Sequence, residues 1–463
     1  MSLVAAILLG FASSFLLLRL GGSIKGQPVA SAIFECSLAA GVGIGIWSVV
    51  YFIARIAGIH HLLLADVAVF LALVIAYVLF RPRPAVAFNL AAAVPGMPQW
   101  LERMLAIAFL PALAAALYSV VVRTLAYPHG DGWDAFSIWN LRARFLFLGG
   151  EQWRDTFSPQ IPWSHPDYPL LIPASAAHFW TLLGRDDVRV PAAITVVFTF
   201  ATIGLLFSTL HMLRGRTAAM LGSLTLVATP AFIEQGTAQY ADVPLSFFFL
   251  AVIALLCLSD ESSAKHGNFV ALAGLAAAFS AWTKNEGLLF LAAIFAAQVL
   301  VTILYRDKLP GAQSGTSWRS CVYFFAGALP VLLVLFYFKH TVAGPGDLFA
   351  NGASALHKLL EPTRYWVVLQ WFVKDFFRFG RWLLIPGTLL LAGFYFTLKS
   401  AAPERSSAMR SCAIALLLTL AGYAAIYVIT PRDLYWHLRF SSDRLFLQLW
   451  PSAIFLFFLG WQR

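Results

Sequence analysis

Several ionisable residues interrupt the long apolar runs of this chain, and their types suit proton transfer. Asp131 and Asp134 follow directly after one such run, in the segment YPHGDGWDAFSIWNLRARF. At a partly dehydrated surface the pKa of a carboxylate can rise far enough for it to take a proton from a hydroxyl group. Asn140 and His165 lie further along the same polar segment and could bind a substrate. The segment therefore predicts acid–base chemistry on a hydroxyl group, with either carboxylate as the base.

Shorter polar insertions stand at the ends of other apolar runs, in QYADVP, TKNEG and PRDLYWHLRFSSDR. Their candidate residues are Asp242, Lys284, Glu286, His437, Arg439 and Arg444. Ionisable groups beside hydrocarbon are functional candidates by default. The three cations could stabilise a departing phosphate, Asp242 could position an acceptor or a cation, and Glu286 and His437 could bind substrate. The alternative is a set of interhelical salt bridges, for instance between Lys284 and Glu286.

The sequence that begins at Asp134 predicts an amphipathic helix lying along the membrane interface. Its apolar side chains would be Trp133, Phe136, Ile138, Trp139 and Phe145. These would sit at headgroup depth while Arg142 and Arg144 reach outward into water. The alternative is an aromatic-belt helix whose acids only balance the two arginines.

The composition shows which solvent these residues face. Of 463 residues, 60% are hydrophobic and 12% are charged, where an ordinary soluble domain has about 25% charged residues. This excludes a soluble enzyme, and the scattered basic residues exclude a nucleic-acid-binding chain. The four cysteines lie in or beside apolar runs without metal-ligand spacing, so we expect them to act as small apolar residues.

The apolar runs predict an all-α integral membrane protein, because a spanning helix needs roughly 20 mostly apolar residues. About thirteen runs meet that measure, near residues 3–18, 29–54, 62–80, 104–123, 190–212, 217–233, 243–259, 268–282, 287–304, 321–338, 382–398, 411–430 and 446–461. The apolar segment 169–184 is short for a span, so we expect a juxtamembrane or re-entrant helix there.

The charge distribution predicts the orientation. The net charge is 32 − 22 = +10, and the excess of basic residues falls in loops on one predicted side, which should be cytoplasmic. The opposite, outer side then holds the long segments 124–189 and 339–381 and the loop 431–445. We expect an N-terminal three-helix extension over 1–103, a core over 104–304 that carries the site, and C-terminal membrane helices over 305–463.

The order of these motifs resembles the GT-C superfamily of integral-membrane glycosyltransferases. The shared features are an Asp and an interfacial helix in the first outer loop, the run HPDYPLL, the Asp at 242 and the turn TKNEG. The similar branch uses polyprenyl-phosphate sugars and includes protein O-mannosyltransferases and lipid A aminoarabinose transferases. The resemblance covers roughly residues 104–304, and it implies a GT-C-like fold with juxtamembrane helices in the first outer loop.

Carried over to this chain, the resemblance implies that Asp134 is the first-loop catalytic Asp, with Asp131 as the rival assignment. It further implies that Asp242 is the second-loop acid, that Lys284 lies near the donor phosphate and that His165 opens the family's HPP-like run. The family usually has an acid directly after the first Asp, whereas Ala135 stands here. A divalent cation is therefore left open as a cofactor.

We thus expect a membrane glycosyltransferase that moves a hexosyl or pentosyl group from a polyprenyl-phosphate donor to a glycan, lipid or protein acceptor. The resemblance implies a bacterial cytoplasmic membrane, with the site facing the periplasm or the exterior. The alternative is a transporter or flippase in which Glu35, Asp66, Lys284 and Asp242 form a relay. Transport predicts polar residues throughout the depth of the helices, whereas here they concentrate at the outer ends.

Overall fold

The structure is a computed structural model that describes residues 2–21, 24–25, 27–80, 86–87, 99–261, 266–305, 318–346, 352–381 and 407–460. In these ranges the chain is almost entirely helical. The only strands there are the two-residue β1 (Ile24–Lys25) and β2 (Val86–Ala87), which pair in parallel.

The helices are described in four consecutive parts of the chain. The N-terminal part holds α1 (Ser2–Gly21), α2 (Pro28–Ile56), α3 (Leu62–Phe80) and α4 (Gln99–Ala126). The first outer segment holds η1 (Ala135–Trp139), α5 (Asn140–Leu148), η2 (Gly150–Phe157), η3 (Pro162–Ser164) and α6 (Leu171–Leu183). The middle of the chain forms α7 (Arg189–Arg214), α8 (Arg216–Val227), α9 (Pro230–Gln235), α10 (Asp242–Asp260), α11 (His266–Thr283) and α12 (Asn285–Tyr305). The C-terminal part forms α13 (Trp318–Thr341), α14 (Gly352–Leu359), α15 (Pro362–Arg378), η4 (Phe379–Arg381), α17 (Ser407–Ile429) and α18 (Leu434–Gly460).

Within the described residues, nine helices are long and apolar enough to cross a membrane, namely α1 to α4, α7, α10, α12, α13 and α17. Each coincides with a run predicted from the sequence. The predicted run 217–233 is instead divided between α8 and α9, because Pro230 begins a new helix. The run 268–282 forms the shorter apolar helix α11, the run 446–461 is the second half of α18, and the run 382–398 lies outside the described residues.

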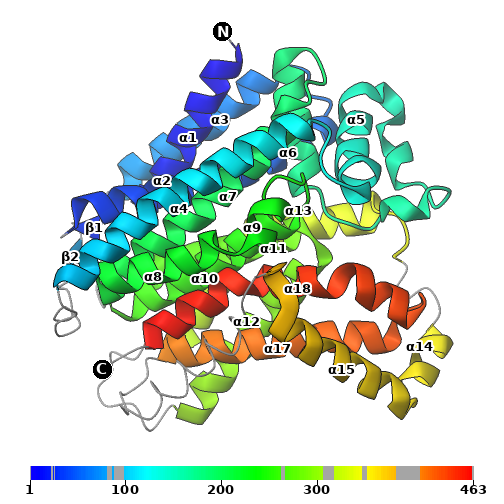
Figure 1. The fold of residues 1–463 in the computed structure, drawn as a ribbon. Coiled ribbons are helices and arrows are strands. Elements are labelled where there is room, and N and C mark those ends of the chain that lie inside the picture. Colours follow the sequence, from blue (N-terminus) through cyan, green and yellow to red (C-terminus); the bar gives the residue numbers. More distant parts are fainter. Residues whose placement is uncertain are drawn as a thin grey trace.

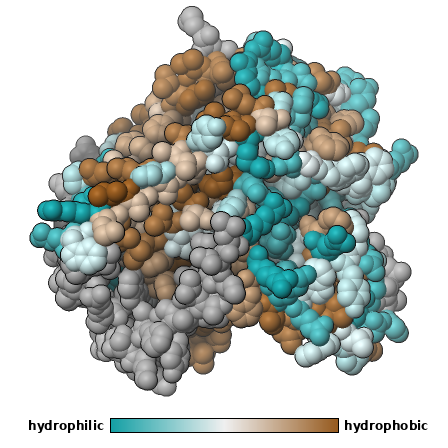
Figure 2. All heavy atoms as spheres, viewed as in Figure 1, coloured by the Kyte–Doolittle hydropathy of each residue, from teal (hydrophilic) through white to brown (hydrophobic). Residues whose placement is uncertain are grey.

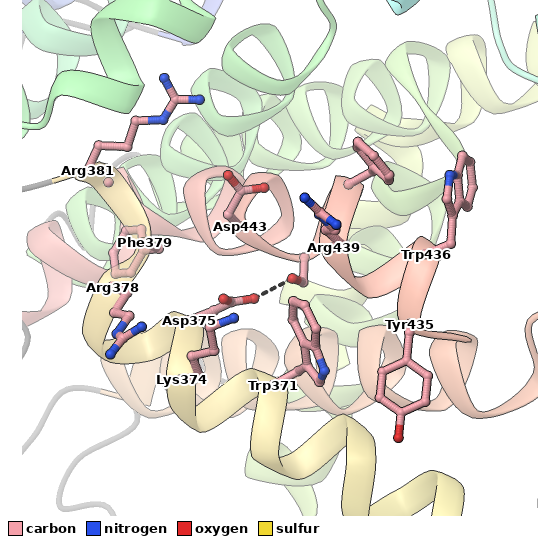
Figure 3. Close-up of a pocket in the computed structure, with 13 residues that line it drawn as sticks. Trp371, Lys374, Asp375, Arg378, Phe379, Arg381, Tyr435, Trp436, Arg439 and Asp443 are labelled. Carbon is pink, nitrogen blue, oxygen red and sulfur yellow. Dashed lines mark hydrogen bonds between the residues drawn. The ribbon is translucent and has the colours of Figure 1, made fainter. Parts of the chain in front are cut away.

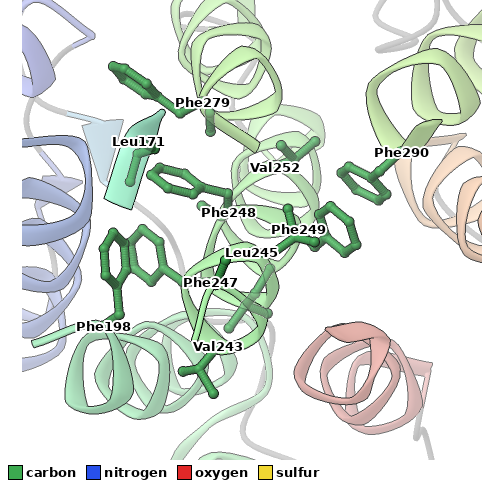
Figure 4. Packing of buried hydrophobic residues seen from close by; sticks show 14 of the residues in the cluster. Leu171, Phe198, Val243, Leu245, Phe247, Phe248, Phe249, Val252, Phe279 and Phe290 are labelled. Atoms are coloured by element: carbon green, nitrogen blue, oxygen red, sulfur yellow. The ribbon is translucent and has the colours of Figure 1, made fainter. Parts of the chain in front are cut away.

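Helix α10 forms the centre of the bundle, and every residue from Asp242 to Ser259 is buried. Its sequence is apolar all round, which is typical of a helix surrounded by other helices. Figure 4 shows Phe247, Phe248 and Phe249 pointing in different directions, towards Phe198 of α7, Phe279 of α11 and Phe290 of α12. This packing fixes the start of α10, where Asp242 lies.

Helices α11 and α13 pack closely because both carry a glycine at their crossing. A Cβ atom on Gly274 would lie 1.9 Å from the carbonyl oxygen of Phe324, and one on Gly327 would lie 1.8 Å from that of Ala271. Small residues of this kind let two membrane helices approach at backbone distance. The crossing holds the end of α11, where Lys284 follows.

The helices extend between two ends of the molecule. In Figure 1, β1, β2 and the C-terminus lie at the left, whereas α5 and α14 lie at the right. Figure 2 shows hydrophobic atoms gathered on the left part of this face and hydrophilic atoms on the right part, over the first outer segment and the start of α18. The candidate residues lie at this hydrophilic end.

The structure corrects two local predictions. The segment 431–445 is not a loop over most of its length, because α18 begins at Leu434 and continues to Gly460. Arg142 does not reach into water: its side chain is fully buried, and it donates hydrogen bonds to the backbone carbonyls of Ser164 at 2.6 Å and Tyr168 at 2.8 Å. The segment that follows Asp134 is therefore packed into the protein at Arg142, whereas Arg144 is half-exposed and pairs with Asp186.

Candidate active site

Three residues from two parts of the chain donate four hydrogen bonds to the carboxylate of Asp242, which is fully buried at the first residue of α10. Its Oδ2 accepts hydrogen bonds from Nε and Nη2 of Arg444 at 2.9 and 2.6 Å. Its Oδ1 accepts from Nε2 of Gln448 at 2.6 Å and from Nζ of Lys284 at 3.2 Å. Both oxygens are thus fully used, since a carboxylate offers about four lone-pair positions.

Arg444 joins this carboxylate to a second one. Its Nη1 donates to Oδ2 of Asp134 at 2.7 Å, so a single guanidinium binds both Asp134 and Asp242. The Asp134 side chain is 24% exposed, and its Oδ1 has no hydrogen-bond partner among the residues that the structure describes. The face of the Tyr240 ring lies 4.6 Å from the guanidinium carbon. Unlike Asp242, Asp134 is therefore partly exposed and keeps an oxygen that can still accept a proton.

Lys284 occupies the one-residue break between α11 and α12. Its Nζ lies 3.2 Å from Asp242 and 2.7 Å from Oε1 of Glu286, and it lies 5.9 Å from the ring of Tyr168. Burial alone would lower the pKa of Lys284, but the two carboxylates outweigh it and raise that pKa above its usual value. The lysine is therefore a permanent cation. Oε2 of Glu286 is buried with no partner within the described part of the chain.

Asp131 does not join this cluster. Its carboxylate lies 2.6 Å from Nη2 of Arg123, at the end of α4, and is 39% exposed. Gly132 separates the two carboxylates with a φ of 96°, and a Cβ atom there would lie 2.5 Å from the hydroxyl oxygen of Tyr240. Across this turn the two carboxylates therefore bind different arginines, Asp131 binding Arg123 and Asp134 binding Arg444. Of the two rival carboxylates, only Asp134 shares a guanidinium, that of Arg444, with Asp242.

Asn140 serves to hold two loops together. Its Nδ2 donates to Oε1 of Gln239 at 2.7 Å and to the carbonyl of His129 at 3.3 Å, and the Gln239 side chain donates to the carbonyl of Pro128. Gln239 has a φ of 61°, a conformation uncommon for a residue with a side chain. These bonds fix the first outer segment against the turn before α10.

His165 and His437 lie beside the cluster. His165 has a φ of 50° and stacks on Tyr168, with ring centroids 4.6 Å apart, while its Nε2 is 3.5 Å from Nη2 of Arg432. Nδ1 of His437 lies 2.8 Å from the hydroxyl of Thr430. Burial, together with Arg432 and Lys284, lowers the pKa of His437 to about 4, so this imidazole is neutral near pH 7.

Arg439 is not placed with the other two predicted phosphate-binding cations. It lines a separate pocket between α15 and the first turns of α18. The cluster itself holds Lys284 and Arg444 against Asp134, Asp242 and Glu286, a formal charge of 2 − 3 = −1. In the described ranges no group of three or more His, Cys, Asp or Glu side chains could hold a metal ion, so the expectation of a divalent cation stays untested.

Sequence reasoning missed several residues that shape the site. Gln448 and Tyr423 are buried, and the hydroxyl of Tyr423 donates a hydrogen bond to Oε1 of Gln448 at 2.6 Å. The Nε2 of the same glutamine donates to Asp242 and so holds that carboxylate in place. Asp167 accepts a hydrogen bond from Asn285 at 2.6 Å, and Lys339 donates to Asn285 at 2.7 Å. A glutamine in an apolar helix is the one signal that could have identified Gln448, since a buried amide needs partners.

Comparison of the chain with models of protein families, with curated proteins and with solved structures finds no match in any of the three.

Proposed function

We propose that this protein is a membrane glycosyltransferase that moves a sugar from a polyprenyl-phosphate donor to an acceptor hydroxyl on the outer face of a bacterial cytoplasmic membrane. One observation carries the proposal: Arg444 binds Asp134 and Asp242 together, beside Lys284, at the polar ends of apolar helices. A potential base and two fixed cations thus lie within one small, partly exposed cluster. A carrier lipid would reach it with its tail still in hydrocarbon.

The proposed reaction uses the free oxygen of Asp134. The acceptor oxygen attacks the anomeric carbon of the donor sugar while its proton passes to Oδ1 of Asp134. The bond between that carbon and the phosphate oxygen breaks, and its electron pair leaves with the phosphate. The products are the glycosylated acceptor and the free polyprenyl phosphate, whose added negative charge the remaining N–H donors of Lys284 and Arg444 stabilise.

Asp242 has a different role in this scheme. Because four hydrogen bonds occupy its two oxygens, it cannot take a proton without losing a partner. It holds Lys284 and Arg444 at fixed positions, which spares the reaction the free energy of reorganising them. The buried free oxygen of Glu286 is placed to accept a hydrogen bond from a sugar hydroxyl.

Donor binding would also activate the base. A phosphate that binds Nη1 of Arg444 takes the place of Asp134, since both are oxygen anions that suit the guanidinium fork. Asp134 then loses its cationic partner, and both of its oxygens are open to the proton of the acceptor hydroxyl.

The test is purified protein in lipid nanodiscs, incubated with polyprenyl-phosphate sugars, with released polyprenyl phosphate measured with and without chelator. We expect release that Asp134→Asn reduces by about 10²-fold or more, the usual contribution of a general base. Asp131→Asn is the matched control, since it removes the neighbouring carboxylate and should keep most of the activity. Full activity of Asp134→Asn would refute the assignment, and loss of release with chelator would show dependence on a metal ion.

The alternative function is transport of a lipid-linked or small polar substrate, and one buried pair of ionisable residues supports it. His178 of α6 and Asp66 of α3 lie 3.1 Å apart within the helices. The predicted relay is not continuous, however, because Glu35 binds Arg19 and Asp66 binds His178, whereas Asp242 and Lys284 bind each other. Release of polyprenyl phosphate that is unchanged in Asp66→Asn would separate the enzyme from a pure transporter.

A further inference from the structure

A pocket of about 780 Å³ lies beside the cluster, between the end of α15, η4 and the first turns of α18. This volume is in the range of pockets that hold small-molecule ligands, roughly 300–1,000 Å³. Figure 3 shows Trp371, Asp375, Arg439 and Asp443 pointing towards its middle. The proposed function leaves this pocket without a role.

Positive charge dominates the lining. Lys374, Arg378, Arg381 and Arg439 face two acids, Asp375 and Asp443, a formal charge of 4 − 2 = +2. Arg381 is bound to Glu234 of α9. The other three cations, Lys374, Arg378 and Arg439, form no ion pair with a carboxylate among the described residues. Lys374 lies 4.1 Å from the ring centre of Trp371, and Arg439 lies over the ring of Phe440. Three cations are thus available to a ligand.

The rest of the lining suits a sugar. Five aromatic side chains surround the pocket, namely Trp371, Phe379, Tyr435, Trp436 and Phe440, and aromatic faces stack on the apolar C–H faces of sugar rings. At the floor, buried Asp375 accepts a hydrogen bond from Ser442. Burial raises the pKa of both Asp375 and Asp443. These acids would repel a bare anion but accept hydrogen bonds from hydroxyl groups.

We infer that this pocket binds the acceptor, and that the acceptor is an anionic glycan, a sugar unit that carries a carboxylate or a phosphate. The cations Lys374, Arg378 and Arg439 bind the anionic group, the aromatic rings bind the sugar faces, and Asp443 accepts hydrogen bonds from hydroxyl groups. The inference rests on the proposed function, because it names the acceptor class for the same site.

The position of the pocket agrees with this role. Asp443 and Arg444 are consecutive residues of α18, and consecutive helical side chains point about 100° apart. Asp443 therefore faces the pocket while Arg444 binds Asp134. Arg439 lies about 7.5 Å closer to the start of the helix than Arg444, at 1.5 Å per residue. A glycan in the pocket can thus extend a hydroxyl group to the free oxygen of Asp134.

The test measures binding and not turnover. Purified protein in phosphatidylcholine nanodiscs is titrated with glucuronic acid, glucose 6-phosphate, glucose and inorganic phosphate, followed by saturation-transfer NMR. We expect both anionic sugars to bind, glucose to bind at least tenfold more weakly, and inorganic phosphate to compete only weakly. The variant Lys374→Gln/Arg378→Gln should weaken the anionic sugars about tenfold, the equivalent of 1.4 kcal/mol. The control Arg185→Gln, at an exposed arginine outside the pocket, should not.

Equal binding of glucose and glucuronic acid would overturn the inference, as would a double variant with unchanged affinity. If neither sugar binds while nanodiscs that contain phosphatidylglycerol protect Lys374 from chemical labelling, the pocket is a lipid headgroup site and the inference is wrong. Because binding needs no donor, a failed transfer assay with intact binding counts against the proposed function alone. Transfer without anionic-sugar binding counts against the pocket alone.

Discussion

Replacing Asp242 by asparagine tests whether the buried cluster is held together by charge. The substitution keeps the size of the side chain but removes the negative charge that Lys284 and Arg444 share. The amide nitrogen of the new side chain would also be a donor, and it would face the N–H groups of residues that now donate to Asp242. Gln448, which donates at 2.6 Å, would then face either an amide oxygen or a second donor.

The expected loss follows from the distances. At 2.6 and 3.2 Å, the two ion pairs are worth about 6 and 5 kcal/mol of Coulomb attraction at an effective dielectric constant near 20. Most of this attraction is offset by the cost of removing the ions from water, and breaking a buried pair typically costs about 3–5 kcal/mol. We therefore expect Asp242→Asn to lower the free energy of unfolding by about 3–5 kcal/mol, and the thermal midpoint by several degrees.

The buried cysteines provide the assay. Cys257, Cys321 and Cys412 are buried and Cys36 is exposed, so a thiol-reactive dye reports unfolding in a Cys36→Ser background. The matched control is Asp131→Asn, which breaks an ion pair of the same length with a carboxylate 39% exposed. Such a surface pair is worth about 0–1 kcal/mol. If Asp242→Asn unfolds no earlier than Asp131→Asn, the cluster does not stabilise the fold and the reasoning fails.

Three further predictions concern the surroundings of the site. Arg142→Gln should cost about 2–4 kcal/mol in the same unfolding assay, because it leaves two buried carbonyls without donors, whereas Arg144→Gln, at a half-exposed pair, should cost under about 1 kcal/mol. The depressed pKa of His437 means that the unfolded chain binds more protons than the folded chain between about pH 6.5 and 4, so stability should rise with pH across that window. His437→Gln should flatten this part of the pH profile of the midpoint, and an unchanged slope would contradict the assigned pKa. Gly130→Ala should destabilise the first outer segment by about 1 kcal/mol or more, since φ is 89° and the new Cβ would lie 2.8 Å from the carbonyl oxygen of Ala238; thermal unfolding measures it.

Among the described residues, the sequence was sufficient to predict nine helices long and apolar enough to cross a membrane, and that charged candidates lie at the ends of such runs. Long apolar runs are a strong signal, because hydrocarbon admits few alternatives to a helix. The same logic identified Asp242 and Lys284, which are rare charges at the edge of such runs. It also predicted the contact between Lys284 and Glu286, as the salt-bridge alternative.

Partners far apart in the sequence were beyond this reasoning. Nothing near Arg444 indicates that it meets Asp134 and Asp242, which lie 310 and 202 residues away. Arg142 was expected in water because its segment has the pattern of an amphipathic helix at the membrane interface. The fold instead buries it, and two backbone carbonyls accept its hydrogen bonds. The polar start of α18 was expected as a loop because its charges suggested solvent, but those charges face the cluster and the adjacent pocket.

The hydrogen bonds of the Arg444 guanidinium give Asp242 and Asp134 different roles. Asp242 receives two of its N–H groups and two further donors, so its oxygens are committed to holding the cations. Asp134 receives one N–H group, and its other oxygen has no partner in the described part of the chain. Asp134→Asn should therefore lower sugar transfer with little change in the thermal midpoint, whereas Asp242→Asn should lower both. If the two variants lost stability equally, Asp134 would be a structural partner of Arg444, and the base would have to be sought elsewhere in the cluster.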